Sequence, residues 1–232
     1  MKCIAIIPAR GGSKRIPRKN IRDFLGKPII AYSIETALAS GLFEEVMVST
    51  DDAEIAAISK HYGARVPFMR SIATSDDFAT TADVLSEVIN KYEQTGSYYD
   101  YACCLYPTAP LLQVKSLRES FRLLKKEKYE TVFPVLRYSY PIWRSLCLKD
   151  SKVAMNWPEH LNSRSQDMPP SFHDAGQFYW LHVRSFIKSG KLFTDNSGAL
   201  ELEDIEAQDI DTLADWKMAE LKYKFLQEKQ PL

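Results

Sequence analysis

The sequence predicts an α/β protein of three layers, in which helices cover both faces of a mainly parallel, Rossmann-like sheet. Short apolar runs alternate with segments of helical periodicity over about the first 135 residues. Strands that alternate with helices need crossover connections, which give parallel strands buried on both faces. Such sheets bind ligands beyond the carboxyl ends of their strands, so we expect functional residues directly after Ala9, Ser49 and Leu105.

The predicted strands are short apolar runs and cover residues 2–9, 45–49, 65–68, 101–105, 131–136 and 174–183. The predicted helices cover residues 28–40, 53–62, 81–94, 114–126 and 212–227. Proline at the start and Gly41 after the end are typical boundaries for the first of these helices. We expect the last helix to bury a stripe formed by Leu213, Trp216, Ala219, Tyr223 and Leu226.

Residues 138–170 break the alternation of strands and helices. They contain Pro141, Trp143, Trp157 and Pro169 and show no helical period. A plain loop of this length is uncommon in a compact domain. We therefore predict a single domain over residues 1–232 with a β-rich arm inserted at 138–170.

The composition excludes several classes of protein. Thirty Lys and Arg residues balance thirty Asp and Glu residues, so no whole-chain field attracts nucleic acid or an anionic membrane. The 45% hydrophobic content excludes disorder, and no apolar run approaches the roughly 20 residues of a membrane span. Residues 1–8 are too short an apolar stretch for a signal peptide, so we expect a cytoplasmic protein. The cysteines lack C-x-x-C spacing, which favours reduced, packed side chains.

The strongest functional signal follows the first predicted strand, where residues 8–20 read PARGGSKRIPRKN. Positions 10–19 hold five basic residues and no acidic one. Adjacent glycines allow positive φ and close backbone approach, and consecutive N–H groups can hold an anion. Arg10, Lys14 and Lys19 would add full charges around a polyphosphate. The stretch matches neither the Walker A nor the G-x-G-x-x-G pattern. We prefer a phosphate site to a solvated basic turn because no counter-charge is present.

Three further segments carry weaker signals. Asp209 and Asp211 lie two apart, so in an extended segment both point the same way, as a Mg²⁺ site needs. From spacing alone, a role of Asp211 or Thr212 as a cap for the final helix is slightly favoured instead. Asp51 and Asp52 have the position of a helix cap. The segment from His173 holds polar groups that form either a sugar contact or a local turn, and no hydrolytic triad is supported.

Together these segments resemble the CMP-sialic acid synthetase family, the cytidylyltransferases that make CMP-activated nonulosonic acids. The opening IIPARGGSKRIPRKN matches that family almost residue for residue. The blocks VSTDD at 48–52, YPTAP at 106–110 and DIDT at 209–212 follow in the family's order. RSQD at 164–167 and HDAGQFYW at 173–180 are similar to the branch that uses pseudaminic acid. The sialic acid enzymes usually have Asn-Gly at 175–176 and Arg at 112, where this chain has Ala-Gly and Leu.

The resemblance implies a nucleotide-diphospho-sugar transferase-like fold and assigns roles by position. Nucleotide binding is implied for Ala9, Arg10, Gly11, Gly12, Ser13, Lys14, Lys19, Asn20, Arg70 and Thr80. Mg²⁺ ligation is implied for Asp209 and Asp211, and catalytic roles for Arg10, Lys19 and Asp211. Sugar-binding candidates are Tyr106, Arg164, Gln166, His173, Asp174, Gln177 and Tyr179, although a structural strand edge explains several of them equally well. The family's homodimers exchange an arm, and residues 138–170 have that arm's position.

The implied reaction transfers CMP from CTP to the anomeric hydroxyl of pseudaminic acid and releases pyrophosphate, for surface glycans or flagellin. The proton acceptor is open between Asp211 and a hydroxide on the metal. One alternative keeps the fold with N-acetylneuraminate, legionaminate or 3-deoxy-octulosonate as the sugar. A second is a non-catalytic module that binds a nucleotide or RNA, which neutral charge disfavours. A third is a regulatory or assembly protein, which the pair Asp209 and Asp211 disfavours.

Overall fold

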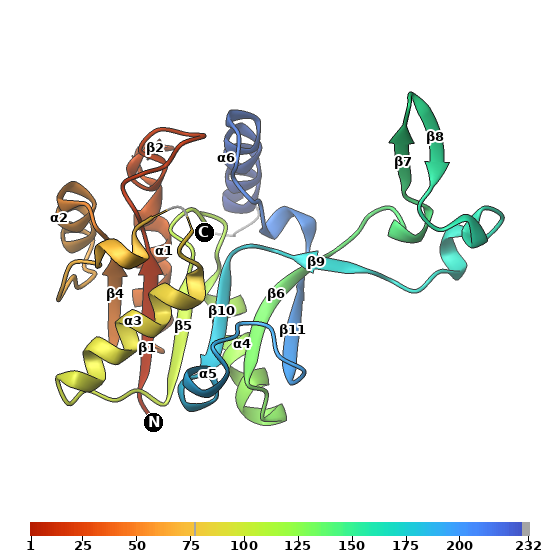
Figure 1. Cartoon of the computed structure of the whole chain (residues 1–232). Coiled ribbons are helices and arrows are strands. Elements are labelled where there is room, and N and C mark those ends of the chain that lie inside the picture. The colour runs from red at the N-terminus through yellow and green to blue at the C-terminus, as the bar shows by residue number, and fades with distance from the viewer. Residues whose placement is uncertain (77, 229–232) are drawn as a thin grey trace.

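The computed structural model describes residues 1–76 and 78–228, and within them a seven-stranded sheet forms the centre (Figure 1). Its strands follow the order β11-β6-β10-β5-β1-β4, and β9 also pairs with β6. The strands are β1 (Cys3–Pro8), β4 (Glu45–Ser49), β5 (Tyr101–Leu105), β6 (Thr131–Arg137), β9 (Phe172–Asp174), β10 (Phe178–His182) and β11 (Ser197–Leu202). A short hairpin, β2 (Asp23–Phe24) and β3 (Lys27–Pro28), stands outside the sheet.

The sheet is mainly parallel, as predicted. β1 pairs in parallel with β4 and β5, and β6 pairs in parallel with β11. β10 runs antiparallel between β5 and β6, and β9 is antiparallel to β6. Along β1, Cys3, Ala5 and Ile7 enter one buried cluster while Ile4 and Ile6 enter another. Both faces of the strand are therefore covered, which explains its continuous apolar sequence.

Helices form a layer on each face, so the predicted three-layer arrangement is confirmed. The helices α1 (Ile29–Ser40), α2 (Ala53–His61) and α4 (Val114–Glu127) contribute Ile34, Ile55 and Phe121 to the first cluster. The helices α3 (Thr81–Gln94) and α5 (Val183–Ser189) contribute Val88 and Phe186 to the second. Because α3 begins beside the carboxyl end of the sheet, its first turn lies near the loops that carry the predicted functional residues (Figure 1).

The last helix, α6 (Leu213–Glu228), packs on the hairpin β2–β3 rather than on the sheet. Trp216 and Ala219 join a buried cluster with Phe24 and Tyr32. The predicted inner stripe is wrong at Leu213, whose side chain is exposed. This helix fixes the segment that precedes it, because the buried Lys222 donates hydrogen bonds to the carbonyls of Asp204 and Ala207.

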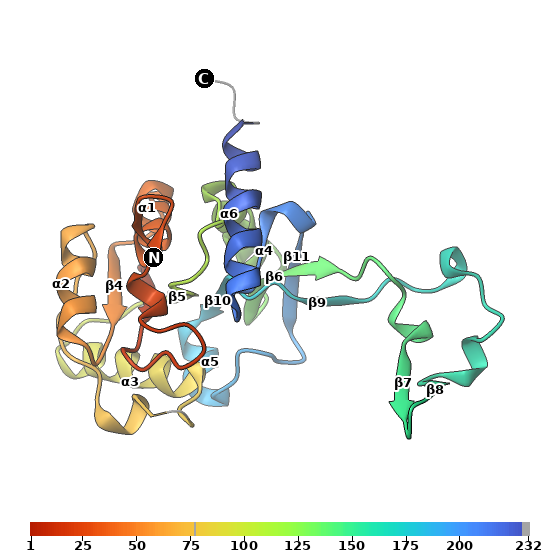
Figure 2. The same ribbon diagram turned by 90° about the horizontal axis from the view of Figure 1, so that it is seen from above.

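The segment that follows β6 leaves the body of the protein and returns as β9, forming an arm (Figure 2). The arm carries an exposed antiparallel hairpin, β7 (Leu146–Lys149) and β8 (Lys152–Met155). Asp150 and Ser151 connect these strands with φ values of 50° and 62°, as in a tight hairpin turn. Beyond the hairpin the arm holds 3₁₀ turns and irregular segments, so it is less β-rich than the sequence predicts.

The structure corrects the predicted elements in several places. Residues 65–68 form a single bridge between Arg65 and Met47 instead of a strand. The predicted strand 174–183 is divided into β9 and β10 by a bend at Gly176, whose φ is 63°. Helix α5 and strand β11 follow in a region where no element is predicted. Within the part of the chain that the structure describes, no helix is both long and apolar enough to cross a membrane.

Candidate active site

The end of β1 and the loop after it, Tyr106 directly after β5, the segment at Arg70 and the start of α3 line a cavity of about 200 Å³. The chain reaches β4 on one side of β1 and β5 on the other, so this is the point at which the strand order reverses. Crevices at such points are the usual ligand sites of α/β sheets. Six of the residues that line the cavity are predicted site residues. The full lining comprises Pro8, Arg10, Ser13, Asn20, Arg70, Ala79, Thr80, Thr81, Val84 and Tyr106.

The two glycines of the basic loop have different surroundings. A Cβ atom on Gly11 would lie 2.7 Å from an Asp52 carboxylate oxygen, whereas one on Gly12 would meet nothing within 4 Å. Neither glycine has a positive φ, so the expected left-handed geometry is wrong for this pair. The residue of the loop that adopts it is Arg18, at 54°. Gly11 is therefore required by its close approach to Asp52, and Gly12 is not required sterically.

Two carboxylates after β4 hold the basic loop, a role beyond the helix cap that the sequence predicts for them. Asp52 is the N-cap of α2 and accepts hydrogen bonds from the amides of Glu54 and Ile55 at 2.9 and 3.0 Å. It also pairs with Arg18, and this hydrogen bond lowers the pKa of the Asp52 carboxyl to about 2. Asp51 accepts a hydrogen bond from the Gly11 amide at 3.0 Å. The sequence carried one signal for this role, because both residues follow the carboxyl end of a predicted strand, where ligand sites of parallel sheets lie. The structure adds that this strand, β4, pairs with β1.

Hydrogen bonds also fix the path of the loop around the cavity. The buried Ala9 donates its amide to the Ser49 carbonyl at 2.9 Å, which extends the pairing of β1 with β4. Asn20, also buried, donates its side-chain amide to the Arg10 carbonyl at 2.9 Å. Arg10, which lines the cavity, donates to the carbonyl of Asp76 at 3.1 Å. The loop is therefore shaped by its neighbours before any ligand binds.

The predicted pair Arg70 and Thr80 lies on the wall of the cavity opposite the loop. Arg70 is 9% exposed, and burial lowers the pKa of its guanidinium group. Its side chain donates to the hydroxyl and the carbonyl of Ser49. Thr80 caps α3 through a reciprocal pair of hydrogen bonds with Asp83. Thr80 therefore both caps α3 and lines the cavity.

The acidic segment meets the basic loop at Lys19. The Lys19 ammonium group donates to the Ile210 carbonyl at 2.7 Å and lies 3.8 Å from the Asp211 carboxylate. Burial lowers the pKa of Lys19, against the opposing effect of Asp211 and Asp209. Asp211 also forms an ion pair of 2.6 Å with Arg15. The residues predicted to hold the triphosphate and the metal are thus neighbours in the fold.

The surroundings of Asp209 fit a divalent cation. Loss of water around its carboxylate raises the pKa of Asp209, and the nearby charge of Asp211 raises it further. A cation between the two carboxylates would relieve this repulsion, and hard oxygen ligands suit Mg²⁺. Among the described residues, no cluster of three or more His, Cys, Asp and Glu side chains is suited to a metal. A metal here would therefore need oxygen ligands from a substrate, which is usual for Mg²⁺ at phosphate sites.

Three of the sugar-binding candidates form one group beside the cavity. The Tyr106 and Tyr179 rings are in contact, with centroids 5.4 Å apart. The Tyr179 hydroxyl donates to the Asp174 carboxylate. Gln177 is next to this group, because its carbonyl accepts a hydrogen bond from the Tyr106 amide at 2.8 Å, but the residue is 2% exposed and its side-chain amide donates to the Glu206 carbonyl at 2.6 Å. The structure therefore favours a structural role for Gln177 over the predicted sugar contact.

The remaining sugar-binding candidates lie away from the cavity in this chain. Arg164 and Gln166 are on the arm, where Arg164 pairs with Asp167 at 2.8 Å and Gln166 lines a separate cavity at the arm's base. His173 is exposed on β9, where its ring contacts Tyr138 and its Nδ1 lies 2.9 Å from the Asp174 carbonyl. One copy of the chain does not bring these three residues to the cavity that Arg10 lines.

Comparisons with known proteins agree with this geometry. The family model described as cytidylyltransferase matches residues 4–213. The chain is 43% identical over 225 residues to a pseudaminic acid cytidylyltransferase of Campylobacter jejuni, covering 97% of each chain. It is 34% identical to a CMP-N,N'-diacetyllegionaminic acid synthase of Legionella pneumophila, covering 98% of this chain and 99% of that protein.

The fold has solved relatives as well. A CMP-2-keto-3-deoxy-manno-octonic acid synthetase complexed with CTP superposes with a TM-score of 0.72 at 19% identity, covering 98% of this chain and all of that one. At this identity the likeness supports the architecture alone. The family model and the near full-length relatives carry the assignment: the chain belongs to the cytidylyltransferase family.

Proposed function

We propose that the chain transfers CMP from CTP to the anomeric hydroxyl of pseudaminic acid, with release of pyrophosphate. The observation that carries the proposal is the cavity at the end of β1, where Arg10, Ser13 and Asn20 face Arg70 and Thr80. The higher identity to the pseudaminic acid relative than to the legionaminic acid relative supports this choice of sugar. Because CTP is a cytoplasmic nucleotide, we place the reaction in the cytoplasm.

In this proposal the basic loop binds the triphosphate. The guanidinium of Arg10 and the ammonium groups of Lys14 and Lys19 neutralise its charge and stabilise the leaving pyrophosphate. Ser13 and the loop amides supply neutral donors, while Arg70 and Thr80 contact the nucleoside. The chain needs little covalent chemistry of its own, because the attack on the α-phosphorus depends on alignment and on charge stabilisation.

Asp209 and Asp211 would hold Mg²⁺ in this proposal. The metal, when bound, supplies positive charge to the phosphate oxygens as negative charge develops there. Replacement of Asp209 by Asn is expected to raise the Mg²⁺ concentration for half-maximal activity at least tenfold, through loss of one of the two protein carboxylates. Titration of activity with MgCl₂ measures this, and Glu201→Gln, at an exposed position on β11, is the control. An unchanged titration for Asp209→Asn would rule out this ligand.

We also propose a homodimer in which each arm completes the neighbour's site. The arm that carries Arg164 and Gln166 extends away from the body of the protein (Figure 2), and neither residue lines the cavity of its own chain. The hairpin on the arm exposes Leu146, Leu148 and Val153, an apolar surface that a second copy would cover. Arg164 and Gln166 of one copy would then join Tyr106, Asp174 and Tyr179 of the other around the sugar. His173, exposed at the root of the arm, remains a candidate for the same site.

The proposal is tested by pyrophosphate release from CTP in the presence of Mg²⁺ and a panel of purified acids. The panel contains pseudaminate, N,N'-diacetyllegionaminate, N-acetylneuraminate and 3-deoxy-octulosonate. We expect kcat/KM to be highest for pseudaminate and CTP to be preferred over other nucleoside triphosphates. A higher value for another acid reassigns the sugar but keeps the reaction. Absence of pyrophosphate release with all four acids, together with salt-sensitive RNA binding, would favour the non-catalytic alternative.

A further inference from the structure

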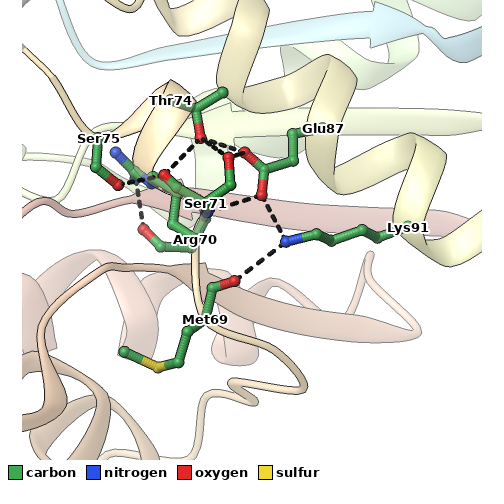
Figure 3. A network of polar contacts seen from close by, with 8 residues as sticks. Met69, Arg70, Ser71, Thr74, Ser75, Glu87 and Lys91 are labelled. Carbon is green, nitrogen blue, oxygen red and sulfur yellow. Dashed lines mark hydrogen bonds and ion pairs between the residues drawn. The ribbon is translucent and has the colours of Figure 1, made fainter.

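Glu87, on the middle of α3, forms a polar network with a surface segment at residues 69–75 (Figure 3). Its carboxylate accepts hydrogen bonds from the Ser71 amide at 2.9 Å, the Ser71 hydroxyl at 2.8 Å and the Thr74 hydroxyl. It also pairs with Lys91 one turn further along the helix, at 2.5 Å. The Glu87 side chain is 13% exposed, so this largely buried carboxylate makes its hydrogen bonds to the segment at residues 69–75 and to Lys91.

The segment has little apolar packing to hold it. Its 3₁₀ turn, Ile72–Thr74, buries none of its residues, and the Ile72 side chain is 91% exposed. A short segment without buried apolar groups depends on polar contacts for its order. The Glu87 carboxylate supplies these contacts directly.

The network fixes the peptide groups on both sides of Arg70. The Met69 carbonyl, which precedes Arg70, accepts a hydrogen bond from the Lys91 ammonium group at 3.1 Å. The Ser71 amide, which follows it, donates to Glu87. The Arg70 amide itself donates to the Thr50 carbonyl at 2.8 Å. The backbone around Arg70 is thus held by α3 on one side and by the end of β4 on the other.

We propose that Glu87 is a positioning residue for CTP: together with Lys91 it fixes the backbone on either side of Arg70 and so presets the Arg70 guanidinium on the cavity wall. This inference rests on the proposed function, because it assumes that the cavity takes CTP. Arg70 uses Nε and Nη2 on Ser49, and the cavity lies beside the same side chain. A preset guanidinium binds its ligand without a further loss of rotamer and loop freedom.

The ionised state that the network requires is secure at physiological pH. Burial opposes ionisation of Glu87, but the hydrogen bonds from Lys91, Thr74 and Ser71 outweigh it and lower the pKa of the carboxyl to about 2. A second buried carboxylate, Glu45, contacts the far end of α3 through Tyr92 and serves as a comparison. Glu45, at the start of β4, is 8% exposed and accepts hydrogen bonds from Tyr92 and from Arg65 at 3.0 Å. It has a similar environment but does not line the cavity.

The experiment compares Glu87→Gln and Lys91→Met with the matched control Glu45→Gln. Steady-state assays give kcat and the KM values for CTP and for the sugar acid, calorimetry gives CTP affinity, and thermal melts give stability. For Glu87→Gln we expect KM and Kd for CTP to rise about tenfold, the loss of one charge-assisted hydrogen bond, while kcat and the sugar KM change less than about twofold. Lys91→Met is expected to give a smaller rise in the same two constants, and Glu45→Gln none.

A merely structural role predicts a different result. It predicts that Glu87→Gln and Glu45→Gln change kcat and the KM values for CTP and the sugar acid in parallel, and this outcome would overturn the inference. An unchanged CTP affinity in folded Glu87→Gln would do the same. If Glu87→Gln does not fold, Lys91→Met decides, since Lys91 is partly exposed and makes the bond to Met69. Failure of the unaltered protein to bind CTP would instead refute the proposed function.

Discussion

The ammonium group of Lys19 donates a 2.7 Å hydrogen bond to the backbone carbonyl of Ile210, across 191 positions of sequence. Ile210 stands between Asp209 and Asp211, so this one contact joins the basic loop to the acidic segment. A cationic side chain of the loop thereby ties down the backbone between the two carboxylates.

Replacement of Lys19 by Ala is expected to lower kcat about 10²–10³-fold, the usual cost of removing a donor that stabilises transition-state charge. The variant also loses the contact with Ile210. Pyrophosphate release at saturating CTP and sugar acid measures the effect. Lys60→Ala, on the exposed side of α2, is the control and should retain full activity. A near-normal kcat in Lys19→Ala would remove the proposed role of this residue.

Gly11→Ala and Gly12→Ala form a matched pair. A Cβ on Gly11 meets the Asp52 carboxylate, which cannot swing away freely because it caps α2 and pairs with Arg18. We expect the melting temperature of Gly11→Ala to fall by about 3–6 °C, as for other overpacked sites, and that of Gly12→Ala to stay within about 1 °C. Differential scanning calorimetry checks both values. Equal melting temperatures for the two variants would contradict the steric argument.

Acid should destabilise the protein through Asp52 and Glu87. Both carboxyls have a pKa of about 2 in the folded chain, below their usual values near 4, so folding favours their ionised forms. Their contribution is complete above about pH 5 and is lost as the pH falls towards 2, with each worth on the order of 1–2 kcal/mol after allowance for solvent screening. Urea unfolding at several pH values measures this. Asp52→Asn, which retains the cap but weakens the pair with Arg18, should show a shallower fall than the unaltered chain.

Arm exchange predicts complementation between two inactive variants. Lys19→Ala damages the body of the site, whereas Arg164→Ala damages the arm. In a mixed dimer, one site combines an intact body with an intact arm from the other copy. Unfolding and refolding the two variants together should restore roughly a quarter of the normal activity, since about half of the dimers are mixed and each has one intact site. No recovery, in a mixture shown by native mass spectrometry to contain mixed dimers, would place Arg164 in its own chain's site or in none.

The sequence by itself determined the layers, most of the strands and the identity of the basic loop. Apolar runs such as Cys3–Pro8 must be buried on both faces, and this requirement alone predicts helices on each side of a parallel sheet. The loop was recognisable because five basic residues stood together without a counter-charge. Strand β11 and helix α5 escaped prediction, since neither has strong apolar periodicity and each is stabilised by neighbours distant in sequence.

Only the tertiary structure decided which polar groups work together. The spacing of Asp209 and Asp211 does not separate a helix cap from a metal site, but the ion pairs of Asp211 with Lys19 and Arg15 set this segment beside the loop. Asp52 is a helix cap, as the sequence predicts, but only the structure shows that it is also the partner of Arg18. The physical reason is common to all these pairs: electrostatic and hydrogen-bonding partners are chosen by distance in space, which the packing of the sheet and its helices sets.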